Sequence, residues 1–192
     1  MTRRILIIDG HPDVRPERLG HALAAAYAEG ARAAGHEVRR IVVGALNLPF
    51  IRSEDDFTSK NVPLAAVAAQ ADVAWAQHLV VFHPLWLGGA PAQLKGFFEQ
   101  VFRYGFALPE GGGLGGLLKG RSARIVVTMG MPALAYRLMF GAFGVRALER
   151  SVLNLSGVRP VRLTFLGGVG GASNRVIAAW LDRMRRLGAA CL

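Results

Sequence analysis

The sequence predicts an α/β fold, namely a doubly wound, five-stranded parallel sheet with helices on both faces. Five short apolar segments alternate with longer segments of helical periodicity, which is typical of parallel sheets. The first strand, first helix and second strand follow one another directly, and such a crossover is right-handed in nearly all known folds. The 192 residues are 52% hydrophobic, so the chain can bury a core without a disulfide or a metal.

The predicted strands are rich in β-branched and apolar residues and show little alternation, as expected of strands covered on both faces. We place them at 4–9, 36–43, 78–83, 123–129 and 161–166. The predicted helices follow from Ala and Leu content and from polar residues at helical spacing. We place them at 17–34, 64–77, 90–102, 132–155 with a break around 141–144, and 172–187.

The length and hydropathy of the chain indicate how many domains it has and whether it crosses a membrane. At roughly 100–200 residues per domain, we expect a single domain over residues 1–192. No apolar run reaches the ~18–20 residues of a transmembrane helix, and the first residues lack the features of a secretion signal. We therefore expect a cytoplasmic protein with no stable membrane insertion.

The net charge of +10 favours an anionic ligand over nucleic acid. Most basic residues are arginines spread along the whole chain, and only Arg183, Arg185 and Arg186 cluster, on the last predicted helix. Nucleic-acid binders usually gather their charge on one face. The lone Cys191 excludes a disulfide framework and a cysteine-based zinc site. No P-loop, nucleophile elbow or zinc-helix motif is present, so we expect no metal site.

Three loops follow predicted strands and should meet at the carboxyl edge of the sheet, where doubly wound folds bind ligands. They are 10–16, 84–90 and 130–132. The first loop precedes a helix, whose N-terminus attracts anions, and Arg15 and Arg18 add charge there. This pattern is consistent with a phosphate site and equally with an ordinary turn that carries surface arginines.

The second loop has the features of a ledge for a flat aromatic cofactor. Pro84 and Pro91 stiffen it, while Gly88 and Gly89 leave its backbone open to close approach. An exposed Trp86 is costly unless it covers something planar. The alternative is that Trp86 packs against its own helix. The third loop, 130–132, would form the opposite wall.

Motifs in these loops and in the adjoining helices resemble those of a known family. The chain contains Gly10-His11-Pro12, Pro84-Leu85-Trp86, the run PAQLKGFFEQVF at 91–102, and Thr128-Met129-Gly130 followed by Tyr136. In this order and over nearly the whole chain, these motifs resemble the flavodoxin-like NAD(P)H:quinone oxidoreductases, the DT-diaphorase and drug-activity-modulator type. The run at 91–102 is the most specific of them.

The resemblance implies a flavin enzyme that transfers a hydride from NAD(P)H through flavin N5 to a quinone or similar acceptor. It implies FAD, with FMN as the alternative; the chain approaches the length of the longer quinone-reductase type and contains the 103–120 segment, and both favour FAD. It implies cofactor contacts from His11, Arg18, Leu19, Gly20, Pro84, Leu85, Trp86, Leu87, Gly88, Thr128, Gly130 and Met131, and a catalytic Tyr136. We also expect backbone N–H groups of 86–88 and 130–131 to stabilise negative charge on the reduced ring.

The sequence departs from the family pattern at several of these positions. Arg18 and Gly20 stand where relatives often have Ser or Thr and Asn, and Leu87 stands where many have an aromatic residue. Phe143 stands where relatives carry a His that supports charge on the reduced flavin. Tyr136 therefore acts either as a proton donor or only as a packing residue over the cofactor.

Relatives of this type form two-fold dimers with the flavin at the seam, so the resemblance implies a homodimer. The phenylalanine-rich stretch 97–106 carries more apolar surface than one sheet face needs, and either it forms that seam or it fills the core. Two other functions remain open. One is a non-catalytic flavin-binding subunit of a membrane transport system, and the other is a basic nucleic-acid-associated protein.

Overall fold

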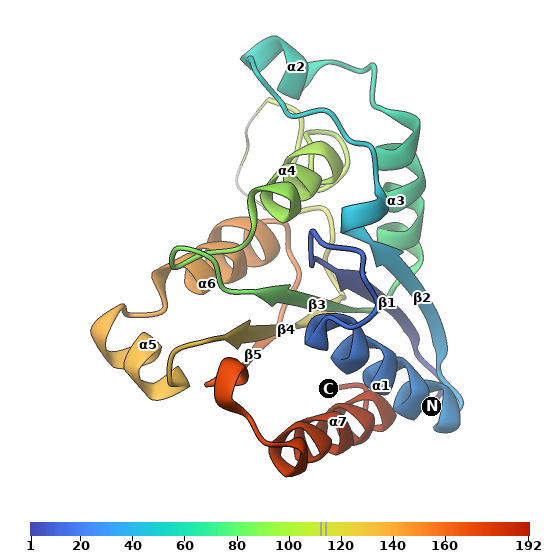
Figure 1. The fold of residues 1–192 in the computed structure, drawn as a ribbon. Coiled ribbons are helices and arrows are strands. Elements are labelled where there is room, and N and C mark those ends of the chain that lie inside the picture. The colour runs from blue at the N-terminus through green and yellow to red at the C-terminus, as the bar shows by residue number, and fades with distance from the viewer. Residues whose placement is uncertain (112, 114) are drawn as a thin grey trace.

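In a computed structural model of the chain, which describes residues 1–111, 113 and 115–192, five strands form one parallel sheet in the order β2-β1-β3-β4-β5 (Figure 1). The strands are β1 (Arg4–Asp9), β2 (Glu37–Val42), β3 (His78–Pro84), β4 (Ser122–Met129) and β5 (Val161–Gly167). Every neighbouring pair runs parallel. The predicted doubly wound sheet is confirmed, and its switch point lies between β1 and β3.

Helices cover both faces of the sheet (Figure 1). The α-helices are α1 (Leu19–Ala33), α2 (Glu54–Thr58), α3 (Leu64–Trp75), α4 (Ala92–Val101), α5 (Ala133–Met139), α6 (Phe143–Ala147) and α7 (Asn174–Ala189). Three short helices of other types are η1 (Val43–Ala45), η2 (Leu148–Asn154) and η3 (Val169–Gly171). One core cluster lies between the sheet and α1 with α7, and the other lies beneath α3 to α6. The predicted break at 141–144 separates α5 from α6.

Most predicted element bounds differ from the structure by one or two residues, and one short helix was not predicted. The first helix begins at Leu19 rather than at position 17, because a turn that closes with the Arg18 N–H on the Arg15 carbonyl (3.2 Å) precedes it. The short helix α2 lies in a segment that we expected to be an irregular connection. Ser53 caps it by accepting from the Asp56 N–H, and acidic residues fill its first turn, so the signal for this helix was present.

The phenylalanine-rich stretch belongs to the core and not to an exposed seam. Phe97, Phe98 and Phe102 are buried, and Phe106 packs against the same cluster. The interpretation of this stretch as a dimer surface was therefore wrong, because α4 turns its phenylalanines toward the sheet. Positions 112 and 114 of the glycine-rich 103–120 segment lie outside the described residues.

Candidate functional site

The three predicted loops meet in a cavity of about 210 Å³ at the carboxyl edge of the sheet. Among the predicted site residues, those that line it are His11, Arg18, Leu19, Gly20, Pro84, Leu85, Trp86, Thr128 and Gly130. Met129 and Val169 line it as well, and the sequence analysis missed both. Val169 follows β5, a strand end that we did not include among the site loops. Parallel strands bring all these segments to one edge, as the topology requires.

The remaining predicted residues lie beside the cavity. Leu87 and Gly88 form the tip of a two-residue turn that two hydrogen bonds close, from the Trp86 N–H to the Gly89 carbonyl (2.9 Å) and back (3.0 Å). Both tip residues have positive φ, 46° at Leu87 and 82° at Gly88, as in a type I′ turn. Leucine rarely adopts this conformation, and the Leu87 side chain is fully exposed. Met131 lies exposed after β4.

This turn decides which backbone donors are available. The Trp86 N–H is already bonded to Gly89, so the expectation that it is free to stabilise a ligand was wrong. Within the residues that the structure describes, the N–H groups of Leu87 and Gly88 make no hydrogen bond. The Trp86 side chain is 51% exposed and meets the His11 ring edge-on, with centroids 6.2 Å apart, rather than packing on its own helix.

Tyr136 lies beneath the turn. Its ring is buried, and its hydroxyl donates to the Gly88 carbonyl at 2.8 Å. Burial raises the pKa of this hydroxyl. Gly144, at the start of α6, packs so close that a Cβ there would lie 2.1 Å from the same Gly88 oxygen. Tyr136 of α5 and Gly144 of α6 therefore hold the turn in place.

The loop after β1 carries less free positive charge than the sequence indicated. Asp13 pairs with both arginines, at 2.6 Å from Arg15 Nη2 and 2.5 Å from Arg18 Nη2. Asp13 therefore neutralises part of the positive charge that Arg15 and Arg18 bring to this loop. Helix α1 still begins without a side-chain cap, so its first N–H groups remain suited to an anion. Burial lowers the pKa of His11, which leaves its ring neutral at pH 7.

A buried carboxylate anchors this loop. Asp9, the last residue of β1, is fully buried and lies 2.7 Å from His21 Nδ1 and 2.5 Å from Arg40 Nη2. The other ring nitrogen of His21 lies 2.8 Å from the carbonyl of Asp13. The network thus ties the loop to β2 and to the first turn of α1. The sequence analysis missed it, although an acidic residue at the end of an apolar strand was a usable signal.

The loop after β4 forms the wall of the cavity opposite Trp86. It has free space above it, and the loop after β5 holds it in place. No atom lies within 4 Å of the position that a Cβ on Gly130 would take, so space is free above the end of β4. The Met131 carbonyl accepts from the Gly168 N–H at 3.0 Å. A Cβ on Gly167 would lie 2.3 Å from the Ala133 nitrogen. The loop after β5 therefore fixes the loop after β4.

Together these features suit a ligand with a flat aromatic part and an anionic part. The His11 and Trp86 rings, the free N–H groups of the turn and the open space at Gly130 fit the aromatic part. The uncapped start of α1 and Arg18 fit a phosphate. In the described part of the chain, no group of His, Cys, Asp and Glu side chains is arranged to hold a metal ion.

Comparison with known proteins agrees with this architecture. The model of the family described as Flavodoxin-like fold matches residues 3–187, so the chain belongs to that family. An uncharacterized NAD(P)H oxidoreductase of Haemophilus influenzae is 27% identical over 173 residues, which are 85% of this chain and 83% of that protein. The ribosyldihydronicotinamide dehydrogenase-like protein traD of Penicillium crustosum is 27% identical over 159 residues. That match covers 66% of this chain and only 57% of the fungal protein.

Solved structures share the fold over the whole chain. An NAD(P)H:quinone oxidoreductase from Methanothermobacter marburgensis superposes with a TM-score of 0.85 at 22% identity, over 100% of this chain and 98% of the other. An FMN-dependent NADH-azoreductase from Bacillus anthracis, in complex with FMN, superposes with a TM-score of 0.76 at 15% identity. That match covers 99% of both chains. At these identities the likeness concerns the fold.

Proposed function

We propose that the protein is a flavin-dependent NAD(P)H:quinone oxidoreductase. The observation that carries the proposal is the cavity at the β1/β3 switch point, where the His11–Trp86 wall and the uncapped start of α1 lie side by side. Its relatives in the flavodoxin-like family are named as NAD(P)H oxidoreductases, which supports the same activity. When bound, a flavin would supply hydride transfer from NAD(P)H and two-electron transfer to a quinone-like acceptor.

Each wall of the cavity has a separate task in this proposal. The first-turn N–H groups of α1 and the Arg18 guanidinium bind the flavin phosphate. The unbonded N–H groups of Leu87 and Gly88 would stabilise negative charge on the reduced ring. Pro84, Leu85 and Trp86 exclude water from one side, and Thr128, Gly130 and Met131 close the other. Tyr136 acts through the Gly88 carbonyl by holding the turn.

We expect FMN rather than FAD as the flavin. The sequence preference for FAD depended on the 103–120 segment, and no described residue of that segment lines the cavity. Its residues Tyr104 and Glu110 instead line another cavity, next to α2. The Bacillus anthracis azoreductase, which shares the fold, was solved with FMN.

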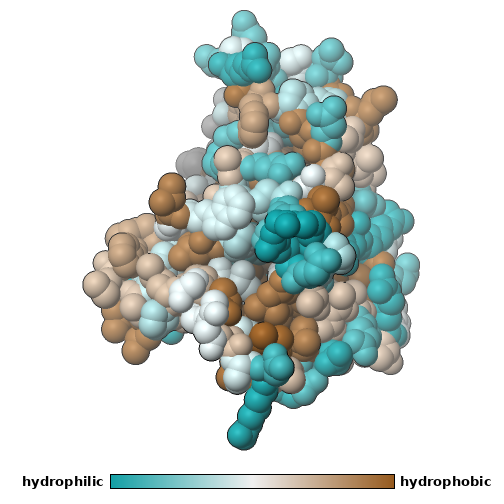
Figure 2. All heavy atoms as spheres, viewed as in Figure 1, coloured by the Kyte–Doolittle hydropathy of each residue, from teal (hydrophilic) through white to brown (hydrophobic). Residues whose placement is uncertain are grey.

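We also propose that the protein is a homodimer. Leu134, Leu138, Met139, Phe140 and Phe143 are exposed and form one apolar surface, here called the α5–α6 surface. Figure 2 shows apolar residues gathered over the lobe that contains α5 and α6. Exposed apolar surface of this kind marks interaction sites in soluble proteins. The surface adjoins the turn at Leu87, so a second copy seated there would cover the cofactor site, as the family resemblance implies.

The proposal is tested by the visible spectrum of the purified protein with added FMN and FAD, followed by an assay of NADH and NADPH oxidation with a soluble benzoquinone. We expect flavin absorbance that persists through gel filtration, FMN as the flavin identified by mass spectrometry, and quinone-dependent turnover. The variant Arg18→Gln should weaken FMN binding about tenfold, because it removes one charge-assisted contact.

Arg15→Gln is the matched control, because Arg15 pairs with the same Asp13 but does not line the cavity. It should change FMN affinity by less than about threefold. A folded protein that binds neither flavin contradicts the proposal. A protein that binds flavin without NAD(P)H-driven turnover is a flavin-binding subunit and not an enzyme.

A further inference from the structure

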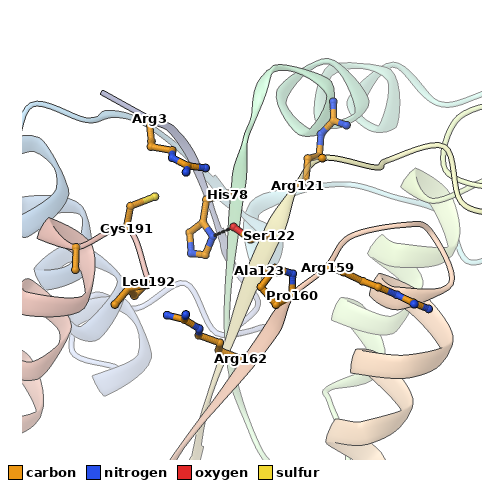
Figure 3. A pocket seen from close by; sticks show the side chains of 12 residues that line it. Arg3, His78, Arg121, Ser122, Ala123, Arg159, Pro160, Arg162, Cys191 and Leu192 are labelled. Carbon is orange, nitrogen blue, oxygen red and sulfur yellow. Dashed lines mark hydrogen bonds between the residues drawn. The ribbon is translucent and has the colours of Figure 1, made fainter. Parts of the chain in front are cut away.

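A second cavity, of about 430 Å³, lies at the amino edge of the sheet, opposite the candidate flavin site (Figure 3). Strand β3 runs from one edge to the other, so the two cavities are about 20 Å apart. The second cavity lies between the first residues of β3, β4 and β5 and the segment of Cys191 and Leu192. Its volume is within the usual range for small-molecule sites.

Unpaired arginines concentrate positive charge at this cavity. Arg124 and Arg162 are direct neighbours in the register of β4 and β5, and like charges placed so are destabilising. Arg124 is 6% exposed, and its one hydrogen bond runs from Nη1 to the Thr164 hydroxyl (2.5 Å), while its Nε has no partner. Arg3 adds a third guanidinium. Among the residues that the structure describes, none of these three arginines pairs with a carboxylate.

A buried histidine lies next to these arginines at the cavity. His78 is 2% exposed, and its Nδ1 lies 2.8 Å from the Ser122 hydroxyl, while its Nε2 has no partner. Burial and the charges of Arg124, Arg3 and Arg162 lower the pKa of His78 to about 4, so the ring is neutral at pH 7. Figure 3 shows Arg3 and Arg162 on opposite sides of this ring. A neutral ring can donate one hydrogen bond to a ligand from Nε2.

Two further arginines border the cavity without facing it. The Arg121 guanidinium donates to the carbonyls of Val73 (3.2 Å) and Ala74 (2.7 Å). The Arg159 side chain points away from His78 (Figure 3). The positive charge that lines the cavity therefore comes from Arg3 and Arg162, and Arg124, the register partner of Arg162 on β4, adds charge next to it.

We propose that this cavity binds a small phosphate monoester, with the phosphate held between Arg3 and Arg162 and accepting a hydrogen bond from His78 Nε2. A phosphate dianion supplies the negative charge that the neighbouring guanidinium groups lack, and guanidinium pairs with phosphate oxygens in a two-pronged geometry. It also gives the buried His78 nitrogen its missing partner. The cavity exceeds the size of a phosphate group, so it has room for the organic part of the molecule.

The test is a titration of the purified protein with glycerol 3-phosphate and with inorganic phosphate, followed by the NMR signals of the His78 ring nitrogens and by calorimetry. His78→Gln identifies those signals by their loss. We expect saturable shifts of the His78 signals and an affinity that falls at least about tenfold in Arg162→Gln. Phosphate bound at the loop after β1 would leave these signals unchanged, because that loop lies at the other edge of the sheet.

Arg159→Gln is the matched control, since it removes the same charge beside the same cavity from a side chain that points away. It should change the affinity less than about twofold. Absence of saturable His78 shifts overturns the proposal. An equal loss in both variants also overturns it, because it indicates attraction to the net charge alone. Displacement of the ester by a short DNA duplex, with equal effects of both variants, assigns the surface to nucleic acid instead.

Discussion

At the scale of single residues, the partner of a side chain decides its role. Tyr136 illustrates this. The family resemblance implies a catalytic role for its hydroxyl, whereas in the structure this hydroxyl donates a hydrogen bond to the Gly88 carbonyl. Arg18 is a second example, since Asp13 takes up part of the charge that the sequence offers to a phosphate. Asp9 is the reverse case. The sequence analysis assigned it no role, yet it pairs with His21 and Arg40 beneath the loop after β1.

The role of Tyr136 is open to a direct test. In Tyr136→Phe the Gly88 carbonyl loses its donor, which costs about 1 kcal/mol, so FMN affinity should fall several-fold. If Tyr136 only positions the turn, kcat of the flavin-saturated enzyme should stay within about threefold of the wild-type value. Steady-state kinetics at saturating FMN measure this. A fall in kcat of about a hundredfold, within the range of general acid catalysis, would instead establish Tyr136 as a proton donor.

At the scale of elements, the site depends on a close approach between a turn and a helix end. The type I′ turn 86–89 extends beyond the sheet with Leu87 at positive φ, which is a strained conformation for a leucine. The start of α6 supports it, and Gly144 is the residue that allows the contact. The break between α5 and α6, visible in the sequence as Gly141 and Gly144, thus has a structural purpose.

Gly144→Ala should displace this turn. The added Cβ would lie 2.1 Å from the Gly88 oxygen and 2.7 Å from Gly89 Cα, so backbone must move. We expect a loss of about 1–3 kcal/mol in the free energy of unfolding and weaker FMN binding. Urea denaturation and flavin titration measure the two effects. Gly171→Ala is the control, because nothing lies within 4 Å of its added Cβ, and it should stay within about 0.5 kcal/mol. Equal effects of the two substitutions would argue against a supporting contact.

At the scale of the whole molecule, the two edges of the sheet differ in chemistry. The carboxyl edge combines aromatic walls, a helix start and the adjoining α5–α6 surface, while the amino edge combines arginines with a buried histidine. Part of the charge of +10 therefore lies at the two proposed anion sites, which is an alternative to nucleic-acid binding. No helix in the described residues is long and apolar enough to cross a bilayer.

The α5–α6 surface should mediate self-association. Analytical ultracentrifugation at micromolar concentration should give a dimer for the wild-type protein. The double variant that combines Leu138→Asp and Met139→Glu should be a monomer. Both side chains are exposed, so the substitutions spare the core but place charge in an apolar contact, which should weaken association at least about tenfold. Leu64→Asp, at an exposed position on α3, should remain dimeric. A monomeric wild-type protein rules out the dimer.

Sequence patterns alone predicted the succession of strands and helices, the parallel sheet and the meeting of three loops at its carboxyl edge. These follow from local hydropathy patterns and from the geometry that all parallel strands share. It also pointed to His11, Trp86 and Gly130, since they lie within a few residues of strand ends.

Which side chains meet depends on the tertiary structure. The contacts of Asp9 with Arg40, of Tyr136 with Gly88 and of Arg124 with Arg162 join residues that lie 31 to 48 positions apart. Their distances depend on strand register and on rotamers that packing selects, and local patterns carry neither. For the same reason the phenylalanines of α4 lie in the core, while the exposed apolar surface lies on α5 and α6.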